Sequence, residues 1–262
     1  MEIKASFLGV LLYSSLLLYA ISAVLMTVRG VKIGKLLFFW GFIFNFSALI
    51  YRWVSVDHLP MQTLFEIFLW LTALVYPLSC FTKKYIDYDT FRLDVFIALV
   101  LVFPAAFVFD GSPRQLPPAL QSAFFGPHVA AYMFSYVLMF KASALSILAM
   151  WSLNDKKNMI MAEKRSYKLV CLGFPLLTLG LLLGCFWAKV AWGRFWGWDP
   201  KELWSFISWL AFVLYFHYRY QNGTKRVLIN HLLVNIGMFF IVVTLVWVNL
   251  SRIFTGLHNY AS

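Results

Sequence analysis

Charged residues are scarce in this chain of 262 residues: only 13% are Asp, Glu, Lys or Arg, whereas 62% are hydrophobic. An ordinary soluble domain is about a quarter charged and roughly half apolar. A soluble domain of this length would bury one core and cover it with charged side chains. The chain has too few charges for such a surface, so the composition excludes an ordinary soluble protein.

Cysteine is also scarce, and the three cysteines form no CxxC pair. Cys80, Cys171 and Cys185 all lie within apolar segments, so the sequence indicates neither a disulfide framework nor a thioredoxin-like redox motif. Walker A, GxSxG, HExxH and GxGxxG motifs are absent as well. We therefore do not expect a conventional hydrolase, kinase or dehydrogenase.

Acidic residues are half as numerous as basic ones, 11 against 22, which gives a formal net charge of +11. The basic residues stand mostly in short links between apolar blocks, where such residues set the orientation of a membrane protein. No basic face or base-stacking platform accompanies the charge. We therefore expect a lipid bilayer, and no nucleic acid, as the surroundings of the chain.

Apolar blocks of about twenty residues, the length that crosses a bilayer as a helix, recur along the whole chain. They predict an all-α integral membrane protein, a bundle of about eight transmembrane helices with an external tryptophan-rich loop. No linker interrupts them, so residues 1–262 are expected to form a single transmembrane domain. The first block is too long for a signal peptide, and basic residues follow it rather than precede it. The predicted spans are Phe7–Val28, Ile33–Val54, Met61–Thr82, Phe91–Phe109, His128–Leu153, Ser166–Ala188, Lys201–Arg219 and Val227–Leu250.

Lys and Arg are about twice as numerous at one end of these spans as at the other. The richer side of a membrane protein is normally cytoplasmic. This predicts that both termini and segments 55–60, 110–127 and 189–200 face outward. The basic stretch Asn154–Arg165 is expected to be a solvated cytoplasmic link.

Aromatic residues concentrate in the segment Trp192–Trp204, which contains Trp192, Phe195, Trp196, Trp198 and Trp204 with two interspersed glycines. The segment ends in a helix start, since Asp199 suits the N-cap, Pro200 the first turn and Glu202 a capping box. Tryptophan gathers at membrane interfaces in general. A cluster confined to one loop instead favours a platform for a broad planar ligand. Arg194, Lys189 or Lys201 could pair with its acidic groups.

Two histidines are expected on the same face as this segment. His128 opens the fifth predicted span and His258 follows the eighth, and paired imidazoles can ligate haem iron axially. His217 lies about 25 Å along its helix from Pro200, too far to share their ligand, and suggests a second, inner site. His58 is a further candidate ligand, whereas His231 is expected to make ordinary hydrogen bonds.

Glu66 and Lys141 are charged residues within predicted spans, and such residues are candidates for function. Their different depths indicate that they do not pair with each other. Glu66 could brace the outer site by hydrogen bonding. Lys141 could bind a carboxylate at an inner site or simply extend towards the membrane surface.

The segment WGRFWGWDPKELWSFISW, residues 192–209, closely resembles the tryptophan-rich WWD signature of haem-handling proteins in cytochrome c maturation. Other stretches resemble the CcsA/ResC branch of that family, and the resemblance covers most of the chain. These stretches are His58–Glu66, Pro127–Tyr136, Phe216–Arg219 and Gly256–Tyr260.

The resemblance implies that the chain binds haem b, iron protoporphyrin IX, as a substrate on the periplasmic face of the inner membrane. His128 and His258 would be the axial ligands of the external haem iron, and His217 would belong to an inner haem site used during passage from the cytoplasm. The WWD segment, about residues 189–209, would cradle the haem. Its implied haem-binding residues are Trp192, Arg194, Phe195, Trp196, Trp198, Asp199 and Trp204.

The resemblance also implies partners. A CcsB/ResB-like membrane protein would supply the second inner ligand, and an apocytochrome c with a CxxCH motif would receive the haem through thioether bonds. The chain would then be part of a holocytochrome c synthase, or haem lyase. Two alternatives stay open: a haem exporter or chaperone without ligase activity, and a membrane regulator of haem biosynthesis.

Overall fold

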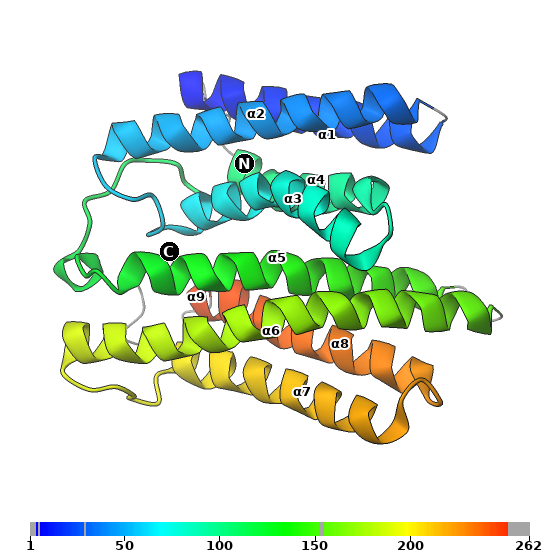
Figure 1. Cartoon of the computed structure of the whole chain (residues 1–262). Helices are drawn as coiled ribbons and strands as arrows, with labels where there is room; N and C mark the ends of the chain where they lie inside the picture. The colour runs from blue at the N-terminus through cyan, green and yellow to red at the C-terminus, as the bar shows by residue number, and fades with distance from the viewer. Residues whose placement is uncertain (1–3, 5, 29, 152–154, 251–262) are drawn as a thin grey trace. The chain divides into compact units, whose positions relative to one another are not determined.

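The computed structural model describes residues 4, 6–28, 30–151 and 155–250. Helices are the only regular elements in this part of the chain, and eight of them are long (Figure 1). The prediction of an all-α membrane protein is confirmed. The long helices are α1 (Phe7–Thr27), α2 (Val31–Val56), α3 (Leu64–Ile86), α4 (Phe91–Phe107), α5 (Phe125–Met150), α6 (Lys156–Trp192), α7 (Pro200–Asn222) and α8 (Val227–Val242). The short elements are the 3₁₀ turn η1 (Pro118–Leu120), the π-helical turn η2 (Val243–Trp247) and α9 (Val248–Leu250).

Six of the described helices are long and apolar enough to cross a membrane: α1, α2, α3, α5, α6, and α8 with its continuation to Leu250. Helix α4 has only 17 residues. Helix α7 is rich in tryptophan, tyrosine and serine, which lowers its mean hydropathy. The eight predicted spans thus correspond to eight helices, six of which meet both requirements.

Helix α6 is longer than the sequence analysis predicts. It has 37 residues and already begins at Lys156, before the predicted start of the span at Ser166. The reason is local. The Asp155 side chain accepts a hydrogen bond from the Asn158 amide at 3.0 Å, and no proline or glycine follows before Gly173. The lysines of this first turn are nevertheless exposed, as expected.

The chain divides into two compact units, Met1–Pro117 and Pro118–Ser262. In the first unit, α1 and α2 form an antiparallel hairpin that packs closely (Figure 1). A Cβ atom at Gly41 would lie 2.5 Å from the Tyr19 ring, and Ser15 donates a hydrogen bond to the Gly41 carbonyl at 3.0 Å. Small residues of this kind let two membrane helices approach and exchange hydrogen bonds.

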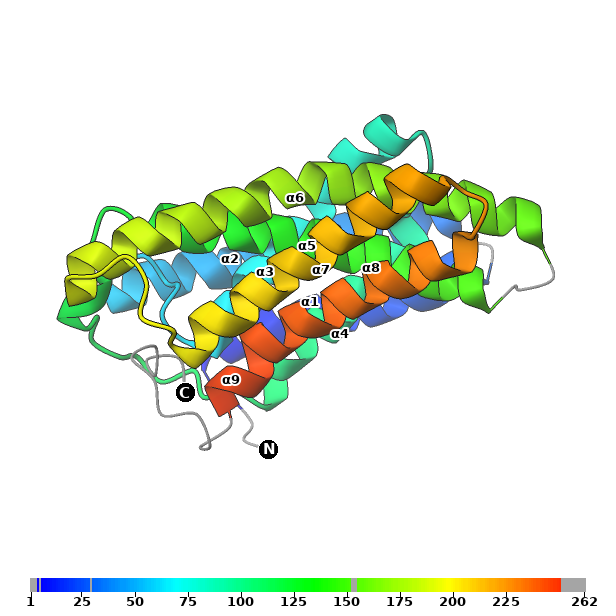
Figure 2. The same ribbon diagram turned by 90° about the horizontal axis from the view of Figure 1, so that it is seen from below.

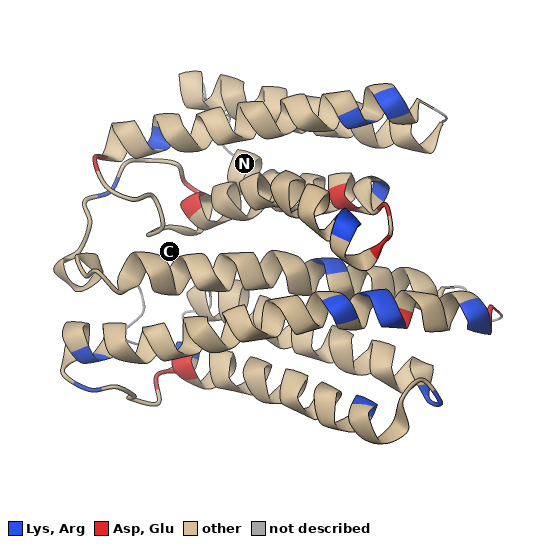
Figure 3. Ribbon diagram, viewed as in Figure 1, with Lys and Arg blue, Asp and Glu red and all other residues tan. Residues whose placement is uncertain are grey.

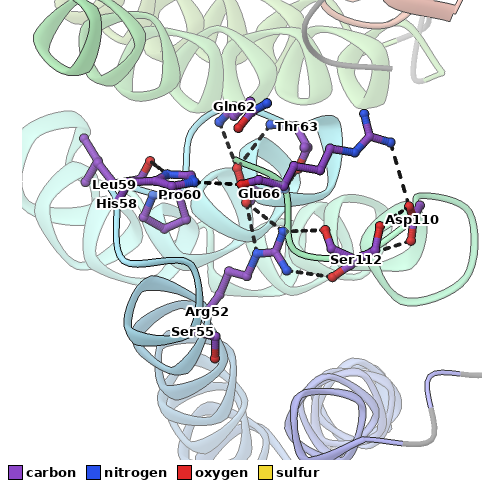
Figure 4. Close-up of polar contacts among 12 residues, drawn as sticks. Arg52, Ser55, His58, Leu59, Pro60, Gln62, Thr63, Glu66, Asp110 and Ser112 are labelled. Carbon is purple, nitrogen blue, oxygen red and sulfur yellow. Dashed lines mark hydrogen bonds and ion pairs between the residues drawn. The ribbon is translucent and has the colours of Figure 1, made fainter. Parts of the chain in front are cut away.

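A buried ion pair joins α2 and α3 at one end of the first unit (Figure 4). Arg52 Nη2 lies 2.9 Å from Glu66 Oε1, and both side chains are almost fully buried. Arg52 also donates to the carbonyl oxygens of Gly111 at 2.6 Å and Ser112 at 2.9 Å. The guanidinium therefore fastens the loop after α4 to the ends of α2 and α3.

The second carboxylate oxygen of Glu66 also accepts hydrogen bonds in this cluster. Oε2 accepts hydrogen bonds from the amides of Gln62 at 2.8 Å and Thr63 at 3.1 Å, and Thr63 caps α3 in return. This capping box explains why α3 starts at Leu64 rather than at Met61. In the nearby loop, hydrogen bonds from Ser112 hold the pKa of the Asp110 carboxyl below its usual range.

The second unit consists of α5 to α9. Helices α5 and α6 pack together, α7 returns antiparallel to α6, and α8 lies beside α7 (Figure 2). Away from the link between α6 and α7, Glu163 accepts hydrogen bonds from Arg219 at 2.6 Å and Asn230 at 3.1 Å, which ties the ends of α6, α7 and α8. Within this unit, charged residues gather towards the helix ends (Figure 3). Lys141 stands nine residues before the end of α5 and is buried.

Candidate functional site

The link between α6 and α7, residues 193–199 with Trp192 before it, is termed the tryptophan loop here. It leaves α6 through Gly193, which adopts the left-handed conformation at φ 77°. Trp198 has φ 56° and is 68% exposed. A bulky residue rarely takes a positive φ, and such strained conformations cluster at functional sites.

The predicted capping box at the start of α7 is confirmed. The Asp199 side chain accepts a hydrogen bond from the Lys201 amide at 2.9 Å. Glu202 Oε2 accepts from the amides of Asp199 at 3.2 Å and Gly197 at 2.8 Å. Because Gly197 lies inside the loop, Glu202 anchors the loop backbone as well as the helix.

His128 lies in the first turn of α5, facing α6. Its Nδ1 is 2.8 Å from the carbonyl oxygen of Gly180. A carbonyl oxygen can only accept, so Nδ1 carries the proton and Nε2 carries the lone pair. Metal-binding histidines commonly donate their second ring N–H in this way, which fixes the tautomer and the ring orientation. The His128 ring also stacks on Trp187, with centroids 5.7 Å apart and planes 17° from parallel.

The imidazole ring packs directly on the backbone of α6. A Cβ atom at Gly184 would lie 2.6 Å from His128 Cε1, closer than real Cβ contacts occur. Glycine at position 184 is therefore a condition for this ring position. Tyr132 packs on Gly180 in a similar manner, one turn further along α5.

A cavity of about 60 Å³ opens beside His128. It has room for about four water molecules, so a porphyrin does not fit inside it. A broad ligand could insert only an edge there, with its remaining surface against the exposed rings at the mouth. The lining residues are His128, Tyr132, Tyr136, Leu181, Gly184, Cys185, Trp187, Phe195, Trp196, Lys201, Glu202, Ser205 and Thr244.

Several of the predicted haem-binding residues come together at this cavity. His128, Phe195 and Trp196 line it. Trp192 packs edge-on against Trp187 at 4.8 Å, and Trp187 in turn stacks on His128. Trp198 packs edge-on against Trp196 at 5.8 Å. One histidine and most of the predicted aromatic platform are therefore adjacent.

The other predicted haem-binding residues of the segment do not line the cavity. Trp204 packs against Phe240 of α8 at 5.9 Å, on another side of α7. Asp199 is buried in the helix cap. Arg194 is exposed, and its guanidinium lies over Gly197, where an added Cβ would meet it at 2.8 Å.

His217 does not line the cavity. This agrees with its expected distance along the helix from Pro200. It is exposed near the other end of α7, and its Nε2 lies 2.9 Å from the side-chain amide nitrogen of Gln221. Because that amide nitrogen can only donate, the Nε2 lone pair is engaged by Gln221. His258 lies outside the described residues.

The remaining candidates have structural contacts. In the first unit, the ring nitrogens of His58 lie 3.1 Å from the carbonyl oxygens of Leu59 and Arg114. His231 is buried and contacts the Met159 carbonyl at 3.1 Å, as expected for ordinary hydrogen bonding. Among the described residues, no three His, Cys, Asp or Glu side chains are grouped to hold a metal ion.

Sequence reasoning missed several cavity residues, and some had a readable signal. Tyr132 and Tyr136 follow His128 at four-residue intervals, which places all three on one helix face. The sequence indicates Lys201 only as one of three cations that could pair with the acidic groups of a ligand. It proves to be largely buried beside the cavity, with Nζ 2.8 Å from Asn249 Oδ1. Thr244 enters through the turn η2, which apolar periodicity alone does not reveal.

Comparison with known proteins adds independent information. The family model described as cytochrome C assembly protein matches residues 5–256. A cytochrome c biogenesis protein CcsA from Chlamydomonas reinhardtii is 31% identical over 93% of this chain and 72% of its own length. CcsA proteins from Ranunculus macranthus and Prochlorococcus marinus are each 30% identical, covering 82% and 81% of this chain and 82% and 78% of their own.

Proposed function

The chain belongs to the cytochrome c assembly protein family, and we propose that it presents haem to apocytochrome c for thioether attachment, as the CcsA-like subunit of a cytochrome c synthase. Its role in cytochrome c biogenesis follows from the family. The haem-presenting role rests on one observation in particular. The Nδ1 proton of His128 is held by Gly180 beside the tryptophan loop, so Nε2 is the nitrogen suited to iron.

In this proposal, His128 and His258 are the axial ligands of a haem at the mouth of the cavity. The rings of Phe195 and Trp196 pack against the macrocycle, and Arg194 with Lys189 pairs with its carboxylates. Haem supplies the iron and the vinyl groups to which the cysteine thiols of a CxxCH motif add. The protein supplies position, since holding reactants together removes much of the entropic barrier.

The proposal places the tryptophan loop on the periplasmic side of the inner membrane. The distribution of basic residues in the second unit supports this orientation, because the ends of its helices away from the tryptophan loop are the richer in Lys and Arg. His217, exposed near that end, would form an inner haem site with a ligand from a CcsB/ResB-like partner.

The absorption spectrum of the full chain purified from membranes tests haem binding. We expect a Soret band that His128→Ala and His258→Ala each weaken or shift, and that added imidazole restores. His58→Ala is the matched control, because His58 contacts only backbone carbonyls in the described structure. A normal spectrum in both ligand variants would reject the ligand assignment.

Co-expression with a CcsB-like partner and a CxxCH-containing apocytochrome separates the alternatives. Covalently attached haem supports the synthase. Haem that is bound but never attached supports an exporter or chaperone. A chain that carries no haem at all favours a membrane regulator of haem biosynthesis.

A further inference from the structure

The exposed side of α6 forms one stripe along the second unit. Its intervals of three, four and seven residues place its members on one helix face. Helix α6 is also the least covered of the six candidate spans, since only 28% of its most apolar stretch is buried. In a membrane protein, such a face lies against lipid or against another membrane protein. We call it the α6 stripe, and its members are Lys164, Lys168, Pro175, Leu179, Leu182 and Phe186.

The α6 stripe changes from apolar to cationic at one level of the helix. Residues 169–188 contain no Asp, Glu, Lys or Arg. This stretch is about 30 Å long, which equals the thickness of the hydrocarbon core of a bilayer. Lys168 therefore stands at the boundary of the core, and Lys164 lies about 6 Å further along the helix, within the headgroup layer. In Figure 3, basic residues mark this part of α6, and the ribbon is then free of charge until its other end.

Lys164 and Lys168 are accessible to a ligand. Both side chains are exposed, and among the described residues no ion pair joins either of them to an acidic side chain. Glu163, the one acidic residue in the sequence of α6, is buried and accepts a hydrogen bond from Arg219 at 2.6 Å. Residues four apart on a helix have Cβ atoms about 5–6 Å apart, and each ammonium group has three donors. One phosphate group can therefore bridge the two lysines.

We propose that the α6 stripe binds an anionic phospholipid from the leaflet at this end of the helix. The phosphate of the lipid lies between Lys164 and Lys168, and its acyl chains lie along Pro175 and Leu179. An acyl chain covers half of the hydrocarbon core, about 15 Å, and the helix from Lys168 to Leu179 is about 17 Å long. The lipid site involves no haem and is independent of the proposed function.

Charge complementarity selects this occupant. A lipid of net negative charge neutralises the two ammonium groups and covers the apolar residues next to them, and basic clusters at membrane surfaces attract anionic headgroups in this way. A zwitterionic lipid carries its own cation, which the lysines repel. A soluble phosphate leaves the apolar residues uncovered. An apolar helix of another protein leaves both lysines without a partner at the boundary of the core.

Native mass spectrometry of the full chain in detergent tests the site. The protein is mixed with equal amounts of phosphatidylglycerol, which is anionic, and phosphatidylcholine, which is zwitterionic, with identical acyl chains. The ratio of the two lipids retained on the protein is measured. Lys164→Gln/Lys168→Gln removes the two charges of the stripe. Lys156→Gln/Lys157→Gln is the matched control, because it removes two exposed charges from the same helix, about 10 Å or more along the axis from Lys164.

We expect the unaltered chain to retain phosphatidylglycerol in preference to phosphatidylcholine. Each lysine near a membrane surface strengthens the binding of anionic lipid about fivefold, so Lys164→Gln/Lys168→Gln should lower the ratio about thirtyfold. Lys164→Arg/Lys168→Arg keeps both charges and should keep the preference, and so should the control. All four lysines are exposed, so each variant should keep the circular dichroism spectrum of the unaltered chain. Glycerol 3-phosphate, a headgroup without acyl chains, should not displace the lipid.

Three results would overturn the lipid site. Equal retention of both lipids by the unaltered chain would mean that unselected lipid or a helix of another protein covers the stripe. An equal loss of preference in Lys164→Gln/Lys168→Gln and in the control would mean that the basic residues attract anionic lipid without a defined site. Displacement by glycerol 3-phosphate would mean that the lysines bind free phosphate and that the apolar residues take no part. None of these results bears on haem presentation.

Discussion

The carbonyl oxygen of Gly180 accepts the Nδ1 proton of His128 across a distance of 2.8 Å. This bond is possible because α6 offers a bare stretch of backbone to the ring, with glycine at positions 180 and 184. The absence of side chains at Gly180 and Gly184 therefore allows α6 to set the orientation of the His128 imidazole.

Gly184→Ala should disturb the haem spectrum without unfolding the protein. The new methyl group would meet the His128 ring at 2.6 Å, and relief of such overpacking costs about 1–3 kcal/mol. We expect lower haem occupancy and a shifted Soret band. Gly173→Ala is the control, because its methyl would lie 3.1 Å from the flexible end of Met139 and 3.3 Å from Leu138 Cβ, both wider than the contact at Gly184. Equal spectra for the two variants would show that the ring position does not depend on Gly184.

Glu202→Ala should loosen the tryptophan loop. The amides of Gly197 and Asp199 lose their acceptor, and loss of a helix cap costs about 0.5–2 kcal/mol. Hydrogen exchange at these two amides, followed by mass spectrometry in detergent, should become faster. Asp155→Ala removes the cap of α6 and should leave exchange in the loop unchanged. Unaltered exchange at Gly197 in Glu202→Ala would contradict the anchoring role.

Arg52→Met should destabilise the protein strongly, because it leaves the Glu66 carboxylate buried without its cation. Breaking a buried pair in this way costs about 3–5 kcal/mol, and replacing both partners restores much of the loss. Denaturant unfolding of Arg52→Met and of the double variant Arg52→Met/Glu66→Met, followed by tryptophan fluorescence, measures both effects.

Lys35→Met is the control for this experiment. Lys35 pairs with Asp89 at a partly exposed position, where ion pairs contribute about 0–1 kcal/mol. An Arg52→Met variant no less stable than Lys35→Met would show that the Arg52–Glu66 pair does not hold the first unit together.

Gln221→Leu should increase haem retention at the inner site. The Gln221 amide occupies the Nε2 lone pair of His217, and a hydrogen bond of about 0.5–1.5 kcal/mol corresponds to a gain of about two- to tenfold once it is removed. The measurement is haem bound per protein in the His128→Ala background. Asn222→Leu changes the adjacent amide, which contacts only the Tyr218 carbonyl. Unchanged retention would argue against iron ligation by His217.

The sequence predicts the helices well because membrane spans leave a strong apolar signal. It also locates the capping box of α7, since the order Asp199-Pro-Lys-Glu202 states the local geometry directly. Thr63 and Glu66 show the same capping-box pattern at the start of α3, and the helix start could have been placed from it. Local motifs of this kind depend only on neighbours in the chain.

Contacts between distant segments were harder to foresee. Arg52 and Glu66 could have been paired by noting that each stands within a turn of the same short link, so an antiparallel hairpin places them at one depth. The stacking of His128 on Trp187, and the entry of Thr244 through a π-helical turn, depend on how α5, α6 and α8 rotate about their axes. Each of these helices carries apolar residues on nearly every face, so the periodicity of apolar residues does not determine that rotation.

The Arg52–Glu66 pair has a consequence for how the chain enters the membrane. An arginine or a glutamate carried into lipid on a lone helix is costly, and here each charge is neutralised only by the other helix. We therefore expect α2 and α3 to be most stable in the bilayer as a pair, and the loop carrying Gly111 and Ser112 completes the cluster once α4 has been made. Variants that lack one member of the pair should therefore leave α2 or α3 poorly inserted, whereas α1 carries no such charge.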